Sequence, residues 1–400
     1  MEKYDLVIIG GGPIGSTLAR EVAVKGKRVL VIERKKNIGY PNHCSGMVSD
    51  EFLETFPLPG NLILNHIKGA NVFSFDNKSI TFRKKEDFAV VIDRIGFDGF
   101  LYEEASSKGA EYILGGVVTS YDRVENGFII HAKGEEDFEI HTHLVAIATG
   151  ASSSIKRMFD FSDQGFSIQT IQTEETFNLD DPEMVNIYMN NEIAHNWFAW
   201  VIPVNKNRAR IGFGTDIKGN LIEDFHKLKS SWKILNITEL KLENPVLWHI
   251  PIGYIRETVK DNCLLVGDSA RQIKPFSGGG LYTGLLSAKF ASEVIVESIE
   301  KKDYSKEFLL KYEKKWKETV GKEIKAELII RDVYVNLSDS EKSKIIERFP
   351  QDTLNEITKK FGLIDTPWKA GFRILYNLKG MLFKYFVRKL SMLFRVSRKP

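Results

Sequence analysis

The hydrophobic positions at the start of the chain form a short run, a stretch with helical spacing and a second short run. Residues 4–9 are apolar and end in glycines, residues 16–25 have the spacing of a helix, and residues 28–33 are apolar again. A later apolar run, 144–150, also ends in glycine. Strands that alternate with helices in this way predict β–α–β units and a parallel sheet.

Alternation of apolar and polar residues dominates two other stretches, 62–92 and 160–216, and predicts antiparallel strands there. Helices are predicted over 95–108, 219–235 and 281–295, and the chain beyond residue 305 has a helical pattern to its end. The expected fold is α/β, with a Rossmann-like nucleotide-binding domain in three pieces, an antiparallel-sheet substrate domain and a C-terminal helical region. The nucleotide-binding domain is expected over 1–60, 90–160 and 255–305. The substrate domain is expected over 61–89 and 161–254, and the C-terminal region over 306–400.

Three glycines follow the first predicted strand with the spacing of a dinucleotide-binding turn. Gly10, Gly12 and Gly15 stand between strand and helix, and Glu33 ends the next strand. In this pattern the first glycine permits the tight turn, the second lets a pyrophosphate approach the backbone, and the third lets the helix pack on the strand. The unpaired N–H groups at the helix N-terminus attract the pyrophosphate. Glu33 is expected to accept hydrogen bonds from the ribose hydroxyls of an adenosine.

A second turn indicates which dinucleotide is bound. Asp268 follows the apolar strand near residue 265, and Gly278, Gly279 and Gly280 precede the helix that starts at residue 281. An aspartate after a buried strand suits a polyol hydroxyl, and a helix N-terminus lined by glycines suits a ring carbonyl that becomes anionic. Reduced flavin needs such a site, whereas nicotinamide does not. We therefore expect one FAD, held at its diphosphate by the first turn and at its ring by the second.

Composition narrows the remaining classes of protein. The 400 residues are 43% hydrophobic and 27% charged, as in an ordinary folded protein. Cys44 and Cys263 are the only cysteines, too few for a disulfide framework, a structural zinc site or an iron–sulfur cluster, so a reducing cytoplasm is expected. No metal site is predicted, because His141 and His143 share a strand face without a third ligand nearby in sequence. Neither a signal peptide nor a membrane-spanning segment is predicted.

The net charge of +3 comes from the end of the chain. Residues 366–400 contain nine Lys and Arg residues and no acidic residue, so the rest of the chain is net negative. Nucleic acid is not an expected partner, because such proteins more often spread basic residues over the folded body. On a helical projection, apolar residues from Trp368 to Leu393 share one face and most basic residues another. This basic amphipathic segment is interpreted either as a peripheral contact with the inner face of a membrane or as a helix packed on the protein itself.

Several motifs together resemble one family of flavoenzymes. They are GGGPIGSTLA with Glu33, the Asp-Arg pair at 93–94, the Ala-Thr-Gly at 148–150 and the run 267–295. These are similar to the FAD-dependent geranylgeranyl reductases, within the larger group that includes the p-hydroxybenzoate hydroxylases, and the resemblance covers roughly residues 3–300. It implies hydrogenation of isoprenoid double bonds. It also implies FAD contacts from Gly10, Gly12, Gly15, Glu33, Arg94, Thr149, Gly150, Asp268, Gly278, Gly279 and Gly280.

The same resemblance implies a catalytic residue. The family carries a Cys-x-Gly segment near the flavin ring, here Cys44 to Gly46. Cys44 is therefore the candidate catalytic residue, and His43 and Gly46 are candidate substrate contacts. The alternative interpretation of Cys44 is a small, buried apolar residue, the commoner role of a free cysteine.

A second segment that resembles the family bears on the substrate. Phe198, Trp200 and Pro203 match aromatic and proline positions of the reductases and are candidate substrate contacts. Because alternate residues of a strand share a face, Phe198, Trp200 and Ile202 predict an apolar wall. Ordinary strand packing is the alternative explanation of that wall.

The expected reaction is transfer of a hydride from reduced FAD to one carbon of an alkene, with a proton delivered to the other carbon. The substrate expected is a prenyl lipid or a prenyl diphosphate. Because such an alkene is unactivated, the reaction needs a dry apolar tunnel with one acid in it. Cys44 is the candidate either for that acid or for positioning the alkene, and an apolar setting is expected to keep its thiol protonated. The external electron donor stays open, since residues 148–153 lack the aspartate of the hydroxylase NADPH fingerprint. The alternatives are an aromatic hydroxylase or halogenase, a flavin electron carrier to a quinone, and an inactive flavoprotein that binds prenyl lipid.

Overall fold

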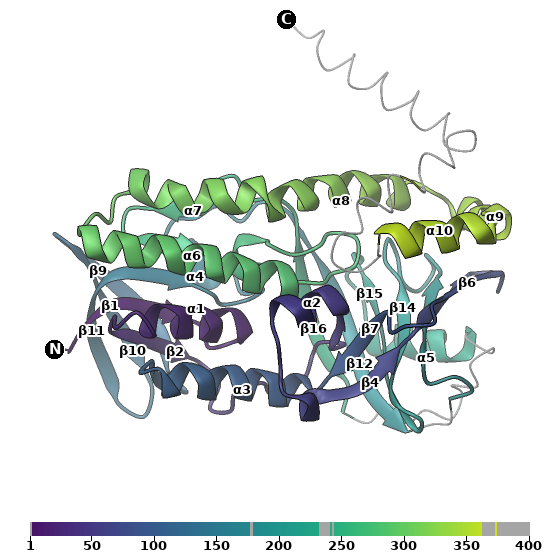
Figure 1. The fold of residues 1–400 in the computed structure, drawn as a ribbon, viewed down its shortest axis with the longest axis horizontal. Helices are drawn as coiled ribbons and strands as arrows, with labels where there is room; N and C mark the ends of the chain where they lie inside the picture. Colours follow the sequence, from purple (N-terminus) through teal and green to yellow (C-terminus); the bar gives the residue numbers. More distant parts are fainter. Residues whose placement is uncertain (1, 177–178, 232–240, 242–243, 362–372, 374–400) are drawn as a thin grey trace, which may run out of the picture.

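The computed structural model describes residues 2–176, 179–231, 241, 244–361 and 373. Two large sheets lie side by side along the long axis of the molecule, and long helices pack against them (Figure 1). The arrangement confirms the predicted α/β class. The domain bounds stay a prediction, although the two sheets divide the chain in the same discontinuous manner.

The first sheet is eight-stranded and follows the path β17-β18-β11-β1-β2-β8, with β10 on β11 and β9 on β10. The pairs from β18 to β8 are parallel, as the alternation of strands and helices predicts. Its strands are β1 (Glu2–Ile9), β2 (Val29–Glu33), β8 (Glu111–Leu114), β9 (Val117–Val124), β10 (Gly127–Lys133), β11 (Asp137–Ile147), β17 (Val259–Lys260) and β18 (Cys263–Leu265).

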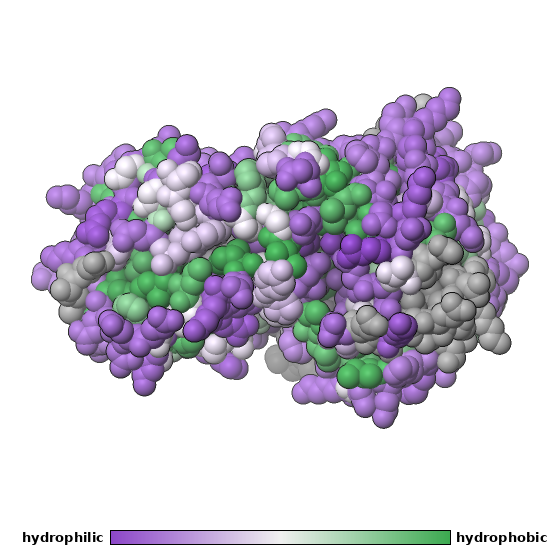
Figure 2. Space-filling model, turned by 90° about the horizontal axis from the view of Figure 1, so that it is seen from below, coloured by the Kyte–Doolittle hydropathy of each residue, from purple (hydrophilic) through white to green (hydrophobic). Residues whose placement is uncertain are grey.

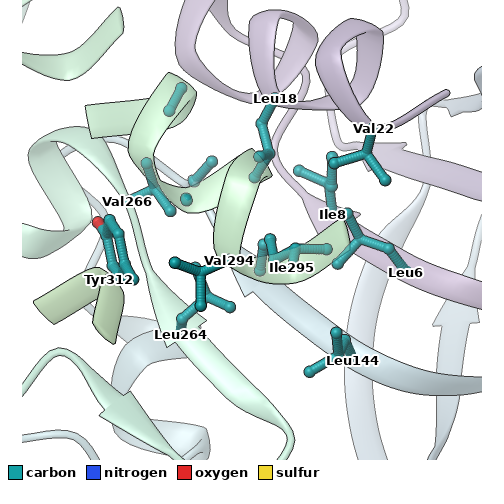
Figure 3. Packing of buried hydrophobic residues seen from close by; sticks show 14 of the residues in the cluster. Leu6, Ile8, Leu18, Val22, Leu144, Leu264, Val266, Val294, Ile295 and Tyr312 are labelled. Carbon is teal, nitrogen blue, oxygen red and sulfur yellow. The ribbon is translucent and has the colours of Figure 1, made fainter. Parts of the chain in front are cut away.

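The helices α1 (Pro13–Ala23) and α6 (Leu281–Lys301) cover one face of this sheet. Figure 3 shows Leu18 and Val22 of α1 and Ile295 of α6 packed over Ile8 of the central strand. These side chains are almost completely buried. Burial of a branched aliphatic side chain contributes about 1.5–3 kcal/mol, so this cluster holds the two glycine turns that begin α1 and α6 in place.

The second sheet is seven-stranded, in the order β16-β12-β15-β14-β13-β5-β6. Neighbouring strands are antiparallel, as predicted, except that β5 and β13 pair in parallel. The bounds are β5 (Gly69–Ser74), β6 (Ser79–Arg83), β12 (Phe166–Thr176), β13 (Met184–Met189), β14 (Ala199–Asn205), β15 (Arg208–Thr215) and β16 (Val246–Ile252).

The strands predicted over 62–92 belong to two different sheets: β5 and β6 are part of the seven-stranded sheet, and the others are part of a small third sheet. Its order is β3 (Met47–Ser49), β7 (Ala89–Ile92) and β4 (Ile63–Ile67). Strand β3 precedes the predicted boundary at residue 60, and β4 and β7 follow it, so the sheet joins the two expected domains. The segment that carries Cys44 leads directly into β3.

The C-terminal region is helical, as predicted, as far as the structure describes it. Helices α7 and α8 run along the top of the molecule, and α9 and α10 lie near β5 and β6 (Figure 1). The amphipathic tail predicted from Trp368 to Leu393 lies outside the described residues, apart from Arg373. The remaining helices are α2 (Asp50–Thr55), η1 (Gly60–Leu62), α3 (Arg94–Ser107), α4 (Ser154–Met158), α5 (Leu221–Ser231), η4 (Gly267–Ala270), α7 (Lys306–Glu318), α8 (Val320–Val335), α9 (Asp339–Arg348) and α10 (Gln351–Phe361).

One face of the molecule is mostly polar. Seen from below, hydrophilic side chains cover most of the face, with hydrophobic residues gathered in bands between them (Figure 2). Across the ranges of the chain that the structure describes, no helix combines the length and the apolar character needed to cross a membrane.

Candidate functional site

One cavity of about 880 Å³ connects the two glycine turns with the seven-stranded sheet. At one end it is lined by the turns after β1 and β18, and in its middle by the segment around Cys44 and by β14. At the other end its walls are β5, β6 and β13 and the helices α8, α9 and α10. The turns at 10–15 and 278–280, which are far apart in sequence, therefore open into the same space.

Each glycine of the first turn has a different environment. Gly10 has φ +111°, and a Cβ atom there would lie 2.4 Å from the Ala148 carbonyl oxygen. A Cβ atom on Gly15 would lie 1.9 Å from the Gly10 carbonyl oxygen, so Gly15 lets α1 approach the turn and does not itself line the cavity. At Gly12 no described atom lies within 4 Å of the added Cβ. Gly12 therefore borders open space, as the predicted approach of a pyrophosphate requires.

Glu33 is held beside this turn by the backbone. Its side chain is 8% exposed, and Oε2 accepts a hydrogen bond of 2.7 Å from the Gly11 N–H. Oε1 accepts a second bond of 2.9 Å from the Lys35 N–H. An ionised carboxylate has about four acceptor sites, so Glu33 keeps capacity for the hydroxyls of a ligand in the cavity that it lines.

Arg94 is buried and lacks acceptors for part of its guanidinium. It begins α3 after the N-cap Asp93, and its Nη2 lies 2.8 Å from Asp98 Oδ1. The side chain is 5% exposed, and Nε and Nη1 have no hydrogen-bond partner within the described residues. Buried donors in native proteins are almost always paired. Since Arg94 lines the cavity, these donors can face a group bound there, and phosphate or carbonyl oxygens of a cofactor would suit them.

The second turn brings Asp268 against the start of α6. Gly278 has φ +75°, and a Cβ atom on Gly280 would lie 2.8 Å from Asp268 Oδ1. Within α6 as described, no side chain caps the N-terminus at Gly280. Burial raises the pKa of Asp268 to about 6, while the Arg94 charge acts in the opposite direction. A carboxylate that a low-polarity setting destabilises gains most from hydroxyl donors on a ligand.

These observations fit a flavin dinucleotide. Open space at Gly12, unsatisfied donors on Arg94 and two uncapped helix N-termini suit its phosphates and ring carbonyls. Thr149 and Gly150 line the cavity between the two turns, and Thr149 Oγ1 lies 3.3 Å from Ser269 Oγ. The individual contacts stay predictions.

Cys44 is half-buried and lines the middle of the cavity. Its Sγ accepts a hydrogen bond of 3.4 Å from the Gly46 N–H. The expected apolar setting of the thiol is wrong, because the Arg94 guanidinium lies beside it. Burial disfavours the charge on Arg94, but Asp98 and Cys44 outweigh this effect and raise the pKa of Arg94. The distance along the sequence from residue 44 to 94 concealed this contact.

His43, the neighbour of Cys44, packs against a residue from the second sheet. Its ring stacks on Trp248 of β16 with centroids 3.8 Å apart and an interplanar angle of 19°. Burial lowers the pKa of His43 to about 4. The imidazole is therefore neutral near pH 7 and lines the cavity, with its Nδ1 3.1 Å from the Pro41 carbonyl oxygen.

The predicted apolar wall is present. Phe198, Trp200 and Ile202 line the cavity, whereas Pro203 does not, because adjacent residues of β14 point to opposite faces. Gly46 also stands outside the lining. It has φ +73°, and a Cβ atom there would lie 2.4 Å from Arg210 Nη1, so it permits close packing of the Cys44 segment on the sheet.

The wall continues across the sheet as an apolar floor that the sequence did not reveal. In strand register, Trp200 is opposite Ile187, Ile187 is beside Val72, and Val72 is opposite Ile80. All four line the cavity. Three strand spacings correspond to about 14 Å. The floor thus leads from the middle of the cavity to the edge strand β6.

The roof over this floor comes from the C-terminal helices. Its lining residues are Ile330, Val333, Leu337, Ile345, Ile346, Phe349 and Leu354. Ser343 Oγ donates to Asp76 Oδ1 at 2.7 Å, which fastens α9 beside the β5–β6 turn. The helical spacing of these apolar residues predicted helices, but it did not indicate which surface they cover.

Comparisons with known proteins show the family to which this chain belongs. Residues 5–351 match the family described as lycopene cyclase protein, to which the chain belongs. A digeranylgeranylglycerophospholipid reductase of Methanosarcina acetivorans is 31% identical over 399 residues, which cover 95% of this chain and 96% of the relative. This protein belongs to the digeranylgeranylglycerophospholipid reductase family. The membership confirms the predicted resemblance and the oxidoreductase class.

Solved structures show that this reductase-family protein shares its fold with enzymes of several chemistries. A geranylgeranyl bacteriochlorophyll reductase-like protein from Thermoplasma acidophilum has a TM-score of 0.85 at 23% identity, over 96% of this chain and 99% of the other. The p-nitrophenol 4-monooxygenase of Pseudomonas putida has a TM-score of 0.71 at 16% identity, over 95% and 98%. At such identities the similarity establishes the fold alone.

The two histidines considered as a metal pair lie away from the cavity lining of this reductase-family protein. His141 and His143 are on β11, with ring centroids 5.7 Å apart, and His143 stacks on Tyr304. Within the described ranges, no group of three or more His, Cys, Asp or Glu residues is placed to hold a metal ion.

Proposed function

We propose that this protein is an FAD-dependent reductase that hydrogenates the isoprenoid double bonds of a prenyl lipid precursor. The observation that carries the proposal is the continuity of one cavity from the two glycine turns to a long apolar tunnel. The relative from Methanosarcina acetivorans is named as a digeranylgeranylglycerophospholipid reductase. We extend that substrate class, a glycerolipid with prenyl chains, to this chain.

The residues that would hold FAD are those of the two turns and the groups between them. Gly10 and Gly12 with the N-terminus of α1 suit the diphosphate, and Glu33 suits the adenosine ribose. Asp268 suits the ribityl hydroxyls, and the turn at 278–280 suits the flavin ring. Reduced FAD, when bound, supplies the hydride.

The prenyl chain would lie on the floor formed by Trp200, Ile187, Val72 and Ile80, under the roof of α8 to α10. These apolar surfaces exclude water, which protects a poorly reactive alkene from competing side reactions. They would also hold the alkene in the cavity that Cys44 and the glycine turns line. Orientation of this kind is a large part of catalysis for a substrate without polar groups.

Cys44 would supply the proton. Because Sγ accepts the Gly46 N–H, the thiol hydrogen is available to point into the cavity. The Cys44 S–H bond would break and its proton would bond to the alkene carbon that does not receive the hydride, which would leave a thiolate at Sγ. Arg94 beside it stabilises the negative charge until solvent returns a proton to the sulfur. The position of the guanidinium thus supports this role of the cysteine.

The test is reduction of a defined substrate by the purified holoenzyme. Chemically reduced protein is incubated without air with digeranylgeranylglycerophospholipid or geranylgeranyl diphosphate, and products are analysed by mass spectrometry. A gain of two hydrogen atoms per reduced double bond is the expected result. Unchanged prenyl chains with fully reduced, FAD-bound protein would overturn the proposal. Oxygenated or halogenated products in air would favour the hydroxylase or halogenase alternative, and oxidation by a quinone alone would favour the electron carrier.

We also propose a peripheral contact with the inner face of a membrane through residues 366–400. The support is the excess of nine Lys and Arg residues over no acidic residue in this segment, together with a lipid substrate. Each basic residue near an anionic surface contributes about 1 kcal/mol. Sedimentation with phosphatidylglycerol vesicles is expected for the full chain and is expected to be lost after truncation at residue 365. Equal sedimentation of both would reject the contact.

A further inference from the structure

We propose that Gln172 is a positioning residue that holds Cys44 and the Trp200 ring in a fixed relation in the wall of the cavity. This inference rests on the proposed function and adds a residue to it. Gln172 lies on β12, is 4% exposed and does not itself line the cavity. It acts through two residues that do.

The two ends of the Gln172 amide bind different elements. Oε1 accepts a hydrogen bond of 3.1 Å from Trp200 Nε1, and Nε2 donates a bond of 3.3 Å to the Cys44 carbonyl oxygen. The indole N–H is only a donor and the carbonyl is only an acceptor. The partners therefore fix which end of the amide faces each of them. One planar group sets the spacing between the strand β14 and the segment that carries Cys44.

The Trp200 ring packs on β15 next to this amide. It lies over Gly212 of β15, where an added Cβ would come within 2.6 Å of Trp200 Cζ2. The missing side chain at Gly212 lets the indole lie over β15 with its N–H toward Gln172. In register, Trp200 is also the first residue of the apolar floor that runs through Ile187. The hydrogen bond to Gln172 thus orients the start of that floor.

The segment that carries Cys44 has a second anchor, but that anchor leaves Trp200 untouched. Arg210 Nη1 donates to the Ser45 carbonyl oxygen at 2.6 Å and to the Ile92 carbonyl oxygen at 3.1 Å. Its Nε donates to Glu174 Oε2 at 3.0 Å. Arg210 therefore fastens the segment to the sheet. Within the described residues, the Gln172 amide is the group that is hydrogen-bonded to both Cys44 and Trp200.

A positioning role makes a specific prediction for the variant Gln172→Glu. An ionised carboxylate still accepts from Trp200 but repels the Cys44 carbonyl oxygen. A protonated carboxyl has one acceptor and one O–H donor, so it restores both bonds. Turnover of Gln172→Glu relative to the unchanged protein is therefore expected to rise as pH falls, whereas a residue that only fills space would give a constant ratio.

The experiment compares four variants of the holoenzyme with equal FAD content. Gln172→Leu and Trp200→Phe are each expected to lower kcat about tenfold, since each removes buried hydrogen bonds at the site. The double variant is expected to be no slower than either single variant, because both changes break one link. Gln169→Leu is the matched control: Gln169 lies on the same strand and donates to the Ile217 carbonyl oxygen, outside the cavity lining, so kcat is expected to be unchanged.

A second measurement does not depend on activity. Cys263 is 2% exposed, so a thiol reagent reports on Cys44. Labelling of the flavin-free protein is expected to be several-fold faster in Gln172→Leu than in Gln169→Leu. Equal labelling together with unchanged kcat, a flat pH ratio for Gln172→Glu, or multiplicative effects of the two single variants would overturn the inference. If the unchanged protein reduces no prenyl lipid, the proposed function fails, while the labelling comparison still decides whether Gln172 holds Cys44.

Discussion

Asp268 offers a test in which stability and cofactor binding change in opposite directions. The carboxyl group lies at the start of a buried turn, where burial raises its pKa from 3.8 to about 6 despite the nearby Arg94. We expect Asp268→Asn to stabilise the flavin-free protein at neutral pH. The same change is expected to weaken FAD binding, because the amide is a poorer acceptor for ribityl hydroxyls than the carboxylate.

The magnitude follows from the difference between the two pKa values of Asp268. One pKa unit corresponds to about 1.36 kcal/mol, so the shift from 3.8 to about 6 amounts to about 3 kcal/mol. Below pH 3.8 the group is protonated in both the folded and the unfolded chain, and it costs nothing. Between 3.8 and 6 the folded chain keeps a proton that the unfolded chain has lost, so stability falls as pH rises. Above pH 6 the full cost is present, and the asparagine removes it.

The assay is urea unfolding of the flavin-free protein, followed by circular dichroism at several pH values. The gain of Asp268→Asn is expected to approach about 3 kcal/mol near pH 8 and to vanish near pH 4. Asp137→Asn, a change at an exposed position at the start of β11, serves as the control without such a gain. FAD titration is expected to show about tenfold weaker binding. A variant that is no more stable at pH 8, or that binds FAD as tightly, would refute the reasoning.

Three further predictions concern other parts of the cavity. Gly12→Ala is expected to keep the stability of the fold but to lose FAD, because its methyl group enters the open space proposed for the pyrophosphate. Gly15→Ala is expected to destabilise the fold by several kcal/mol, because its methyl group clashes with the Gly10 carbonyl oxygen. Thermal unfolding and flavin absorbance distinguish the two outcomes. The pKa of His43 is lowered from 6.5 to about 4, so the free energy of unfolding is expected to decrease by up to about 3 kcal/mol as the pH is lowered from 6.5 to 4. The decrease is expected to be smaller in His43→Phe. Urea unfolding measures both, and equal pH profiles of the two proteins would contradict the prediction. Ile187→Trp is expected to block the apolar floor and abolish prenyl reduction with FAD still bound, while Ile187→Leu keeps activity; product analysis by mass spectrometry decides.

Local patterns were enough to predict the turn at residues 10–15 and the parallel strands around it. A glycine turn between strand and helix is specified by nearest neighbours, and the residues 10, 12 and 15 have the packing or open space that the spacing implies. The alternation of Phe198, Trp200 and Ile202 also predicted one lining face correctly. These features depend on backbone conformation within a few residues, and the local pattern of residue types predicts that conformation.

The contacts that crossed long distances in sequence were not predictable in this way. The apolar setting expected for Cys44 was wrong because Arg94 reaches it from another element, and periodicity carries no information about such a neighbour. The link from Gln172 to Cys44 joins residues 128 positions apart. A glutamine on a strand gives no signal that its amide is buried and bonded at both ends.

The sequence by itself determined the order of strands and helices, the two glycine turns, and the family whose motifs these turns carry. Those properties follow from steric and hydrogen-bonding preferences of short segments. Only the tertiary structure decided that both turns open into one cavity, that α8 to α10 roof an apolar floor, and that a guanidinium stands beside the thiol. The physical reason is that burial and charge act through space, so their effect on a residue depends on which distant segments the fold packs around it.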